Sequence, residues 1–204
     1  ELAHQWFGDL VTCKDWAHTW LNEGFATLFS AVWAEHDLGR DEYDYEIYED
    51  MQRGIEGGKK APVVDRRYEE EGEMFDSRAY PKGASILHML RHRLGDAKFW
   101  AAVKMYLTHF AHSPVETDNF RQSLEIESGR SLERFFYDWT QRPGAPAVSV
   151  NYDWSDDDRL AKGVVKQTQD ADAFEFPLEI EFHFDEGAPA LVSTEITEKE
   201  QRVY

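Results

Sequence analysis

The chain has 204 residues, of which 42% are hydrophobic and 14% aromatic, and these can form the core of one large or two smaller domains. Its 22 basic and 40 acidic residues give a net charge of −18, which excludes nucleic-acid backbones and anionic membrane surfaces as partners. No apolar run approaches the roughly 20 residues of a membrane span. The single Cys13 excludes an intramolecular disulfide, which slightly favours the cytoplasm without fixing the compartment.

Residues 1–12 predict a first helix that opens with part of a metal motif. Residues 1–4, E-L-A-H, match the last four positions of the motif H-E-x-x-H. In that motif two histidines on one helical face bind zinc, and the glutamate polarises the zinc-bound water. The leading histidine is missing from the sequence, so one ligand and the water-activating glutamate are left. Because a Glu and a His three residues apart also arise by chance on acidic helices, other segments must support this interpretation.

Residues 20–38 predict a second helix, since apolar side chains recur at spacings of three and four and Gly39 follows as a stop. Eighteen residues separate His4 from Glu23, which lies near the start of this helix in the run W-L-N-E-G-F-A. A carboxylate at this position can reach back to the metal as a further ligand.

An acidic, tyrosine-rich helix is predicted over 41–56, and 59–79 predicts a loop whose acidic cluster at 69–73 faces solvent. The run S-R-A-Y-P-K-G-A follows and puts Tyr80 just ahead of the next helix, where its hydroxyl can face the metal site. We expect its neighbour Lys82 to face solvent.

The middle of the chain predicts a helical bundle. Helices are expected over 82–94, 97–111, 117–128 and 131–140, with Asp96 and Thr117 as N-caps and Gly95 and Gly129 as stops.

One pair of histidines in this bundle has metal-ligand spacing. His88 and His92 stand four apart, but Met89 occupies the position of the water-activating glutamate. Since such pairs arise readily on any helix, a second metal site is disfavoured.

A boundary is predicted at 141–146, where two prolines and a glycine end the last helix. Apolar and polar residues then alternate over 148–154 and 178–184, with shorter strands at 164–165 and 191–192 and a turn at 185–187. This period of two predicts antiparallel strands with one buried face.

The segments around His4, Glu23 and Tyr80 together resemble the zinc aminopeptidases of the gluzincin group, the family of aminopeptidase N and leukotriene hydrolase. That family has H-E-x-x-H, then eighteen residues, then a glutamate in W-L-N-E-G-F-A, and later a tyrosine in Y-x-K-G-A. Three separated segments of this chain agree with it in residues and in order.

The resemblance implies the roles of four residues. Glu1 is the general base and proton shuttle, His4 and Glu23 are zinc ligands, and Tyr80 steadies the oxyanion during hydrolysis of N-terminal peptide bonds. It also implies a mostly α fold, with a thermolysin-like helical catalytic subdomain over 1–142 and the start of an antiparallel β-sandwich over 147–204. Zn²⁺ is the implied cofactor and a peptide the implied substrate.

Several departures from the family pattern modify these expectations. The first zinc histidine is absent, and so is the G-x-M-E-N segment that holds the substrate's amino terminus, so the chain is expected to be an internal fragment that binds zinc weakly and turns over little peptide. An unfinished sheet edge is expected to favour a homodimer. The alternatives are a non-catalytic structural or interaction module with the same fold and, at low weight, a bifunctional epoxide hydrolase. Retention of all four named residues favours the peptidase.

Overall fold

The structure, a computed structural model, describes residues 1–157, 160–184 and 187–203. The chain divides into two compact units, Glu1–Gly144 and Ala145–Tyr204. The first is helical and the second consists of antiparallel strands, so the predicted mostly α fold followed by a β region is confirmed. The predicted turn at 185–187 lies partly outside the described residues.

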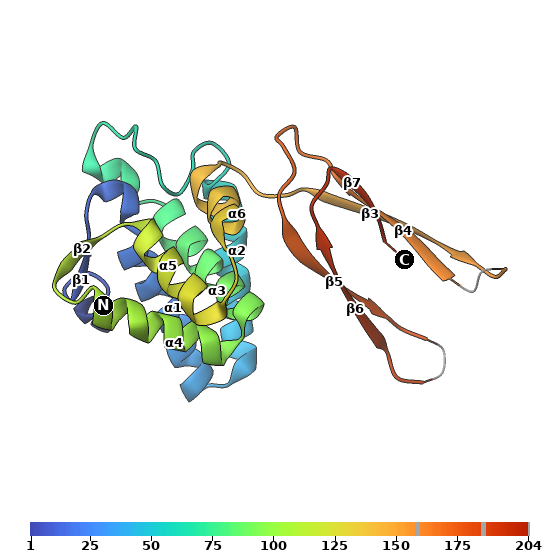
Figure 1. The fold of residues 1–204 in the computed structure, drawn as a ribbon, viewed down its shortest axis with the longest axis horizontal. Coiled ribbons are helices and arrows are strands. Elements are labelled where there is room, and N and C mark those ends of the chain that lie inside the picture. The colour runs from blue at the N-terminus through green and yellow to red at the C-terminus, as the bar shows by residue number, and fades with distance from the viewer. Residues whose placement is uncertain (158–159, 185–186, 204) are drawn as a thin grey trace. The chain divides into compact units, whose positions relative to one another are not determined.

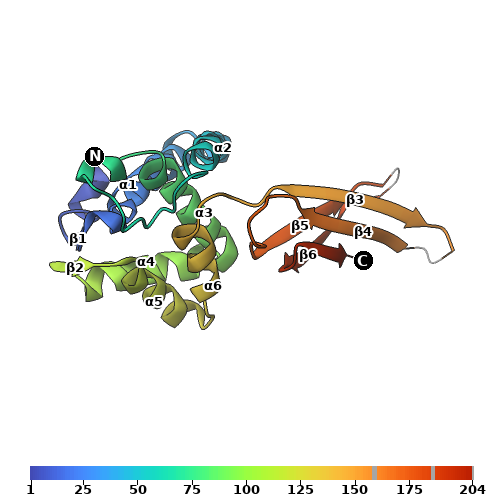
Figure 2. The same ribbon diagram turned by 90° about the horizontal axis from the view of Figure 1, so that it is seen from above.

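Six α-helices form most of the helical unit (Figures 1 and 2). They are α1 (Trp20–Asp37), α2 (Arg40–Gly57), α3 (Gly83–Leu94), α4 (Asp96–His109), α5 (Thr117–Ser128) and α6 (Glu133–Phe136). The predicted helices are confirmed to within a few residues at each end, except that α6 is short and continues as the π-helical turn Tyr137–Gln141. In the predicted loop 59–79, the 3-10 helix Glu71–Met74 forms, while the acidic residues 69–73 face solvent as expected.

The core of the helical unit is aromatic. Phe25 on α1 stacks on Phe7 with ring centroids 4.0 Å apart, and Phe120 on α5 meets Phe25 edge-on at 5.1 Å. Tyr106 on α4 also meets Phe120 edge-on. Offset and edge-on ring pairs stabilise a core beyond the area that they bury. The apolar spacing of three and four in these helices therefore marks one shared core.

The predicted helix over 1–12 is wrong beyond its first turn. Leu2–Gln5 form a 3-10 helix, and the chain then turns through Gly8, whose φ of +143° suits glycine rather than a helix. Val11–Cys13 continue as the strand β1, which pairs in parallel with β2 (Ser113–Val115). This pair was not predicted, because three-residue strands carry no readable alternation and their partners are about one hundred residues apart in sequence.

Two predicted helix caps are displaced by one residue, and two stops are confirmed. The N-caps of α4 and α5 are Gly95 and Glu116, so Asp96 and Thr117 are the first helical residues instead. Glu116 and Asn119 exchange side-chain and backbone hydrogen bonds in a capping box. Gly95 and Gly129 end α3 and α5 with positive φ, as expected of glycine stops.

The described residues of the second unit form five strands in two antiparallel sheets. One sheet has the order β3 (Val148–Ser155), β4 (Leu160–Gln167), β7 (Glu200–Val203), and the other pairs β5 (Phe176–Phe182) with β6 (Ala190–Ile196). The predicted antiparallel strands are confirmed, and β7 is an additional strand. The predicted buried face is wrong for β3, since Val148, Val150, Tyr152 and Trp154 are all exposed.

Candidate metal and catalytic site

The helical unit brings His4 and Glu23 together. His4 lies in the 3-10 helix Leu2–Gln5 and Glu23 in the first turn of α1. His4 Nε2 and Glu23 Oε2 are 3.4 Å apart, and both side chains are largely covered. Nitrogen and carboxylate donors with this separation form either an ion pair or two neighbouring ligands of one ion.

The orientation of the His4 ring favours metal binding. Nδ1 lies 3.0 Å from the carbonyl oxygen of Phe7 and donates to it, which leaves the lone pair of Nε2 directed toward Glu23. A backbone carbonyl that fixes the ring in this way is the usual partner of a metal-binding histidine. Two ligands about 2.0–2.1 Å from a tetrahedral zinc ion stand about 3.3 Å apart. His4 and Glu23 therefore fit zinc as two of its ligands.

The ligand set of the described residues stops at two. No group of three or more histidine, cysteine or acidic side chains that could hold a metal occurs among residues 1–157, 160–184 and 187–203. A catalytic zinc ordinarily has three protein ligands and one open position.

Tyr80 and Glu1 both interact electrostatically with the Glu23 carboxylate. Tyr80 lies in the π-helical turn Arg78–Lys82, and its hydroxyl and the Glu23 carboxylate are close enough to shift each other's pKa. Burial, and then the charge of Glu23, raise the pKa of Tyr80, so its hydroxyl stays a donor. Burial also raises the pKa of Glu23, and the negative charge of Glu1 raises it further, while His4 lowers it. The four residues named from the sequence thus form one electrostatic cluster.

Close backbone contact between α1 and α3 sets this arrangement. A Cβ added to Gly24 would lie 2.9 Å from the carbonyl carbon of Gly83, which opens α3. Real Cβ atoms do not approach that closely, so only glycine lets the two helices meet here. Because Gly24 follows Glu23 and Gly83 lies three residues after Tyr80, this contact brings the two side chains to one place.

Comparison with known proteins identifies the family of the chain. The sequence profile of the peptidase family M1 domain matches residues 1–139. The chain belongs to peptidase family M1. Aminopeptidase M1-A of Oryza sativa subsp. japonica is 36% identical over 155 residues, which cover 74% of this chain and 18% of that protein. Probable aminopeptidase 2 of Sulfurisphaera tokodaii is 36% identical over 167 residues, 76% of this chain and 21% of the relative. The chain thus spans about a fifth of the length of these relatives.

Solved structures of M1 enzymes match the fold. The M1 zinc metallopeptidase of Deinococcus radiodurans superposes with a TM-score of 0.62 at 35% identity, over 72% of this chain and 32% of that one. Aminopeptidase A of Legionella pneumophila matches 100% of this chain and 23% of its own length, with a TM-score of 0.79 at 23% identity. The resemblance to the gluzincin zinc aminopeptidases is therefore confirmed. In the part of the chain that the structure describes, no helix is long and apolar enough to cross a membrane.

Arg78 anchors the π-helical turn that carries Tyr80, and the sequence analysis did not identify this arginine. The buried guanidinium donates to Asp76 at 2.8 Å, to the Glu73 carbonyl at 2.8 Å and to the Pro62 carbonyl at 3.3 Å. Asp65 lies 3.5 Å away on the same group. Arg78 therefore ties the long loop to the turn that carries Tyr80. The neighbouring aspartate in D-S-R-A-Y was the only sequence signal for it.

Lys82 is buried, which corrects the expectation that it faces solvent. It is 5% exposed, and Nζ donates to the Gly144 carbonyl at 3.1 Å. The glycines of α2 make room for it, since a Cβ at Gly54 would lie 2.8 Å from Lys82 Cα. Burial, and then the nearby charge of Arg78, lower the pKa of Lys82 to about 8. The methylene groups of Lys82 are buried, while its ammonium group donates to the Gly144 carbonyl.

Two other expectations concern residues outside the M1 site. His88 Nδ1 lies 2.8 Å from the Tyr43 hydroxyl, so this histidine is engaged in a hydrogen bond between α3 and α2. Cys13 is partly buried, and burial raises the pKa of its thiol. Neither arrangement resembles a nucleophile or a ligand set.

A groove of about 510 Å³ adjoins Glu1. Its lining is largely apolar and includes Leu2, Trp6, Phe29 and Trp33. The candidate site therefore borders an apolar surface on the side of Glu1.

Proposed function

We propose that this chain forms the core of the metal site of a zinc aminopeptidase, an enzyme that removes N-terminal residues from peptides. The observation that carries the proposal is the cluster around Glu23, in which His4 Nε2 lies 3.4 Å from the carboxylate and both Tyr80 and Glu1 shift its pKa. The M1 relatives, several of which are named aminopeptidases, support the same reaction class.

Each residue has a distinct task in this proposal. His4 and Glu23 hold the ion. When bound, zinc supplies Lewis-acid polarisation of the scissile carbonyl and of a water molecule. Glu1 accepts the proton of the attacking water and delivers it to the leaving amine, since one carboxylate can serve as base and then as acid. Tyr80 donates a hydrogen bond to the developing oxyanion, a contact worth about 100 to 1000-fold in rate.

The number of zinc ligands in this chain limits the zinc affinity and the peptidase activity that we expect of it. With two of three protein ligands, we expect weak zinc binding and little or no peptide turnover. We also propose that residues 1–142 and 147–204 are separate domains, the second being the start of a β-sandwich.

A zinc titration tests the proposal. The chain is compared with a version that carries one histidine before Glu1, which would supply the missing ligand of H-E-x-x-H. We expect tight, stoichiometric zinc only in the extended version, and loss of it on His4→Gln or Glu23→Gln. His109→Gln, on the exposed end of α4, is the matched control.

Two outcomes would contradict the proposal. Equal weak binding by both versions would mean that His4 and Glu23 do not form a zinc site in this chain. Tight zinc binding and peptide cleavage by the unextended chain would disprove the expected inactivity.

A further inference from the structure

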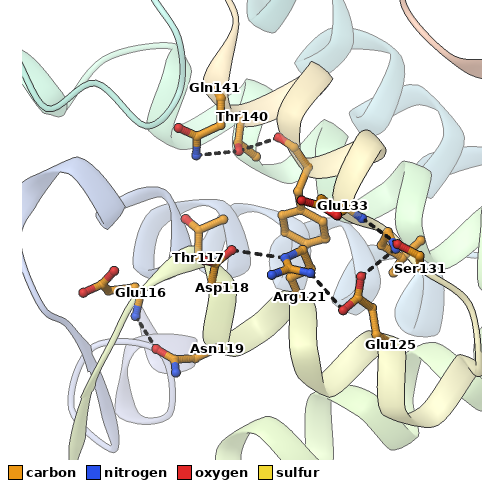
Figure 3. Close-up of polar contacts among 12 residues, drawn as sticks. Glu116, Thr117, Asp118, Asn119, Arg121, Glu125, Ser131, Glu133, Thr140 and Gln141 are labelled. Atoms are coloured by element: carbon orange, nitrogen blue, oxygen red, sulfur yellow. Dashed lines mark hydrogen bonds and ion pairs between the residues drawn. The ribbon is translucent and has the colours of Figure 1, made fainter.

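A second, polar pocket lies in the helical unit and shares no lining residue with the groove at Glu1. Its volume is about 290 Å³, and its lining includes His18, Arg66, Glu116, Asp118, Arg121 and Glu133. Figure 3 shows the part of it formed by the start of α5 and by α6, where Asp118 and Arg121 face Glu133. None of these residues belongs to the candidate metal site.

The hydrogen bonds of buried His18 fix which ring nitrogen carries the proton. The Trp20 indole N–H donates to Thr117 Oγ1 at 2.9 Å, so the hydroxyl proton of Thr117 is free to point at His18 Nδ1, also 2.9 Å away. The Thr117 backbone N–H donates to the same Nδ1 at 3.2 Å. Nδ1 is therefore an acceptor, and in the neutral ring Nε2 carries the hydrogen. Burial favours that neutral ring, because it lowers the pKa of His18.

Among the residues that the structure describes, none offers an acceptor within hydrogen-bond distance of the Nε2–H of His18, which lines the pocket. Its nearest polar neighbour is Arg66 Nη2 at 3.4 Å, and a guanidinium has only donors to offer. Glu116 Oε2 is 3.9 Å away, beyond hydrogen-bond distance, and the other oxygen of that carboxylate binds Lys14. His18 is 1% exposed, so bulk water does not satisfy it. Two donors that converge in this way are satisfied by one shared acceptor, and a carboxylate oxygen is the strongest available.

The other end of the pocket has the opposite charge. Asp118 pairs with Arg121 at 3.1 Å, and Arg121 pairs with Glu125 at 2.9 Å, so this arginine is already balanced by two carboxylates. Within the described residues the Glu133 carboxylate has no hydrogen-bond or ion-pair partner, and Arg66 has no carboxylate within ion-pair distance. A simple anion would meet the acidic end unfavourably. A ligand with both charges would complement both ends.

We propose that this pocket binds a free amino acid in its zwitterionic form. The carboxylate accepts hydrogen bonds from His18 Nε2 and Arg66, and the ammonium group faces Glu133 and Asp118. This inference does not depend on the proposed zinc chemistry, because binding can be measured without metal and without turnover.

The experiment follows the His18 ring resonances by NMR in histidine-labelled protein while glycine, N-acetylglycine or glycinamide is added. N-acetylglycine lacks the ammonium group and glycinamide lacks the carboxylate. We expect glycine to shift His18 Nε2 and to bind about tenfold or more tightly than either analogue, since each loses a charged hydrogen-bond partner. Arg66→Gln and Glu133→Gln, both at exposed positions, should each weaken glycine binding by a similar factor.

Arg67→Gln is the matched control, because Arg67 is exposed beside Arg66 but pairs with Asp65 outside the pocket. It should leave glycine binding unchanged. Equal binding of glycine and N-acetylglycine would overturn the proposal in favour of an anion site. Absence of any His18 shift, or an equal effect of Arg66→Gln and Arg67→Gln, would overturn it as well.

Discussion

The helical unit buries a cluster of large aromatic side chains, whereas on strands β3 and β6 many of the large apolar side chains face solvent. Phe25 and Phe120 are fully buried, while Tyr152 is 82% exposed and Trp154 55%. The helices therefore gain their stability from a shared aromatic core, and the sheets depend more on backbone hydrogen bonds between strands. The candidate metal site lies on the unit with the dense core, where side-chain positions are held firmly by packing.

The largest change in unfolding free energy is expected when one aromatic side chain in each unit is truncated to alanine. Phe25→Ala removes a ring that stacks on Phe7 and meets Phe120, and it should lower the free energy of unfolding by about 3–5 kcal/mol. Tyr152→Ala on β3 should change it by less than about 0.5 kcal/mol. Urea unfolding monitored by circular dichroism measures both. Similar losses for the two variants would contradict the contrast.

A smaller effect is expected at the contact between α1 and α3. Gly24→Ala places a methyl group 2.9 Å from the Gly83 backbone, which must shift, at a cost of about 1–3 kcal/mol in unfolding free energy. Gly72→Ala is the control, because a Cβ there meets nothing within 4 Å. If the two alanine variants were equally stable, the close approach of the helices would be wrong.

The pH dependence of stability should reveal His88 in the helical unit. Burial, and then the charge of His92, lower the pKa of His88 from 6.5 to about 4. Between pH 6.5 and about 4, His88 is protonated in the unfolded chain but stays neutral in the folded chain. The free energy of unfolding therefore falls as the pH drops, by up to about 1.4 kcal/mol per pH unit. Below about 4 this loss is complete.

Urea titrations of the wild type and His88→Gln across pH 7 to 4 measure this contribution as the difference between the two slopes. His36→Gln, at an exposed position of α1, is the control. Parallel pH profiles for the wild type and His88→Gln would show that the buried ring does not resist protonation.

The smallest effect on stability is expected on β3. Val150→Lys replaces an exposed side chain and should change the unfolding free energy by no more than about 0.5 kcal/mol. Self-association through these strands stays a prediction, since exposed apolar edges recruit further chains. Light scattering across a wide concentration range should show a dimer that Val150→Lys weakens. A constant monomer mass would disprove it.

Much of the helical unit could be predicted because periodic apolar residues report burial directly, as in α1 and α4. The four candidate site residues could be named because each lies in a short motif with a fixed spacing, and their roles stay predictions. Arg78 and Lys82 could not be placed, since a charged residue is assigned to the surface unless its partner is known. The partner of Lys82 is the carbonyl of distant Gly144, and Arg78 is covered by a loop whose course the sequence does not reveal. The β1–β2 pair was missed for a similar reason.

The glycine contact between α1 and α3 also restricts how this protein can move. Helices whose backbones are in direct contact have no layer of side chains between them that could repack, so they slide past one another only with difficulty. Glu23 and Tyr80 therefore travel together as parts of one rigid piece. In the proposed zinc site, opening or closing around a substrate would then come from segments that move against this pair, and the spacing between the proposed ligand and the proposed oxyanion donor would stay constant.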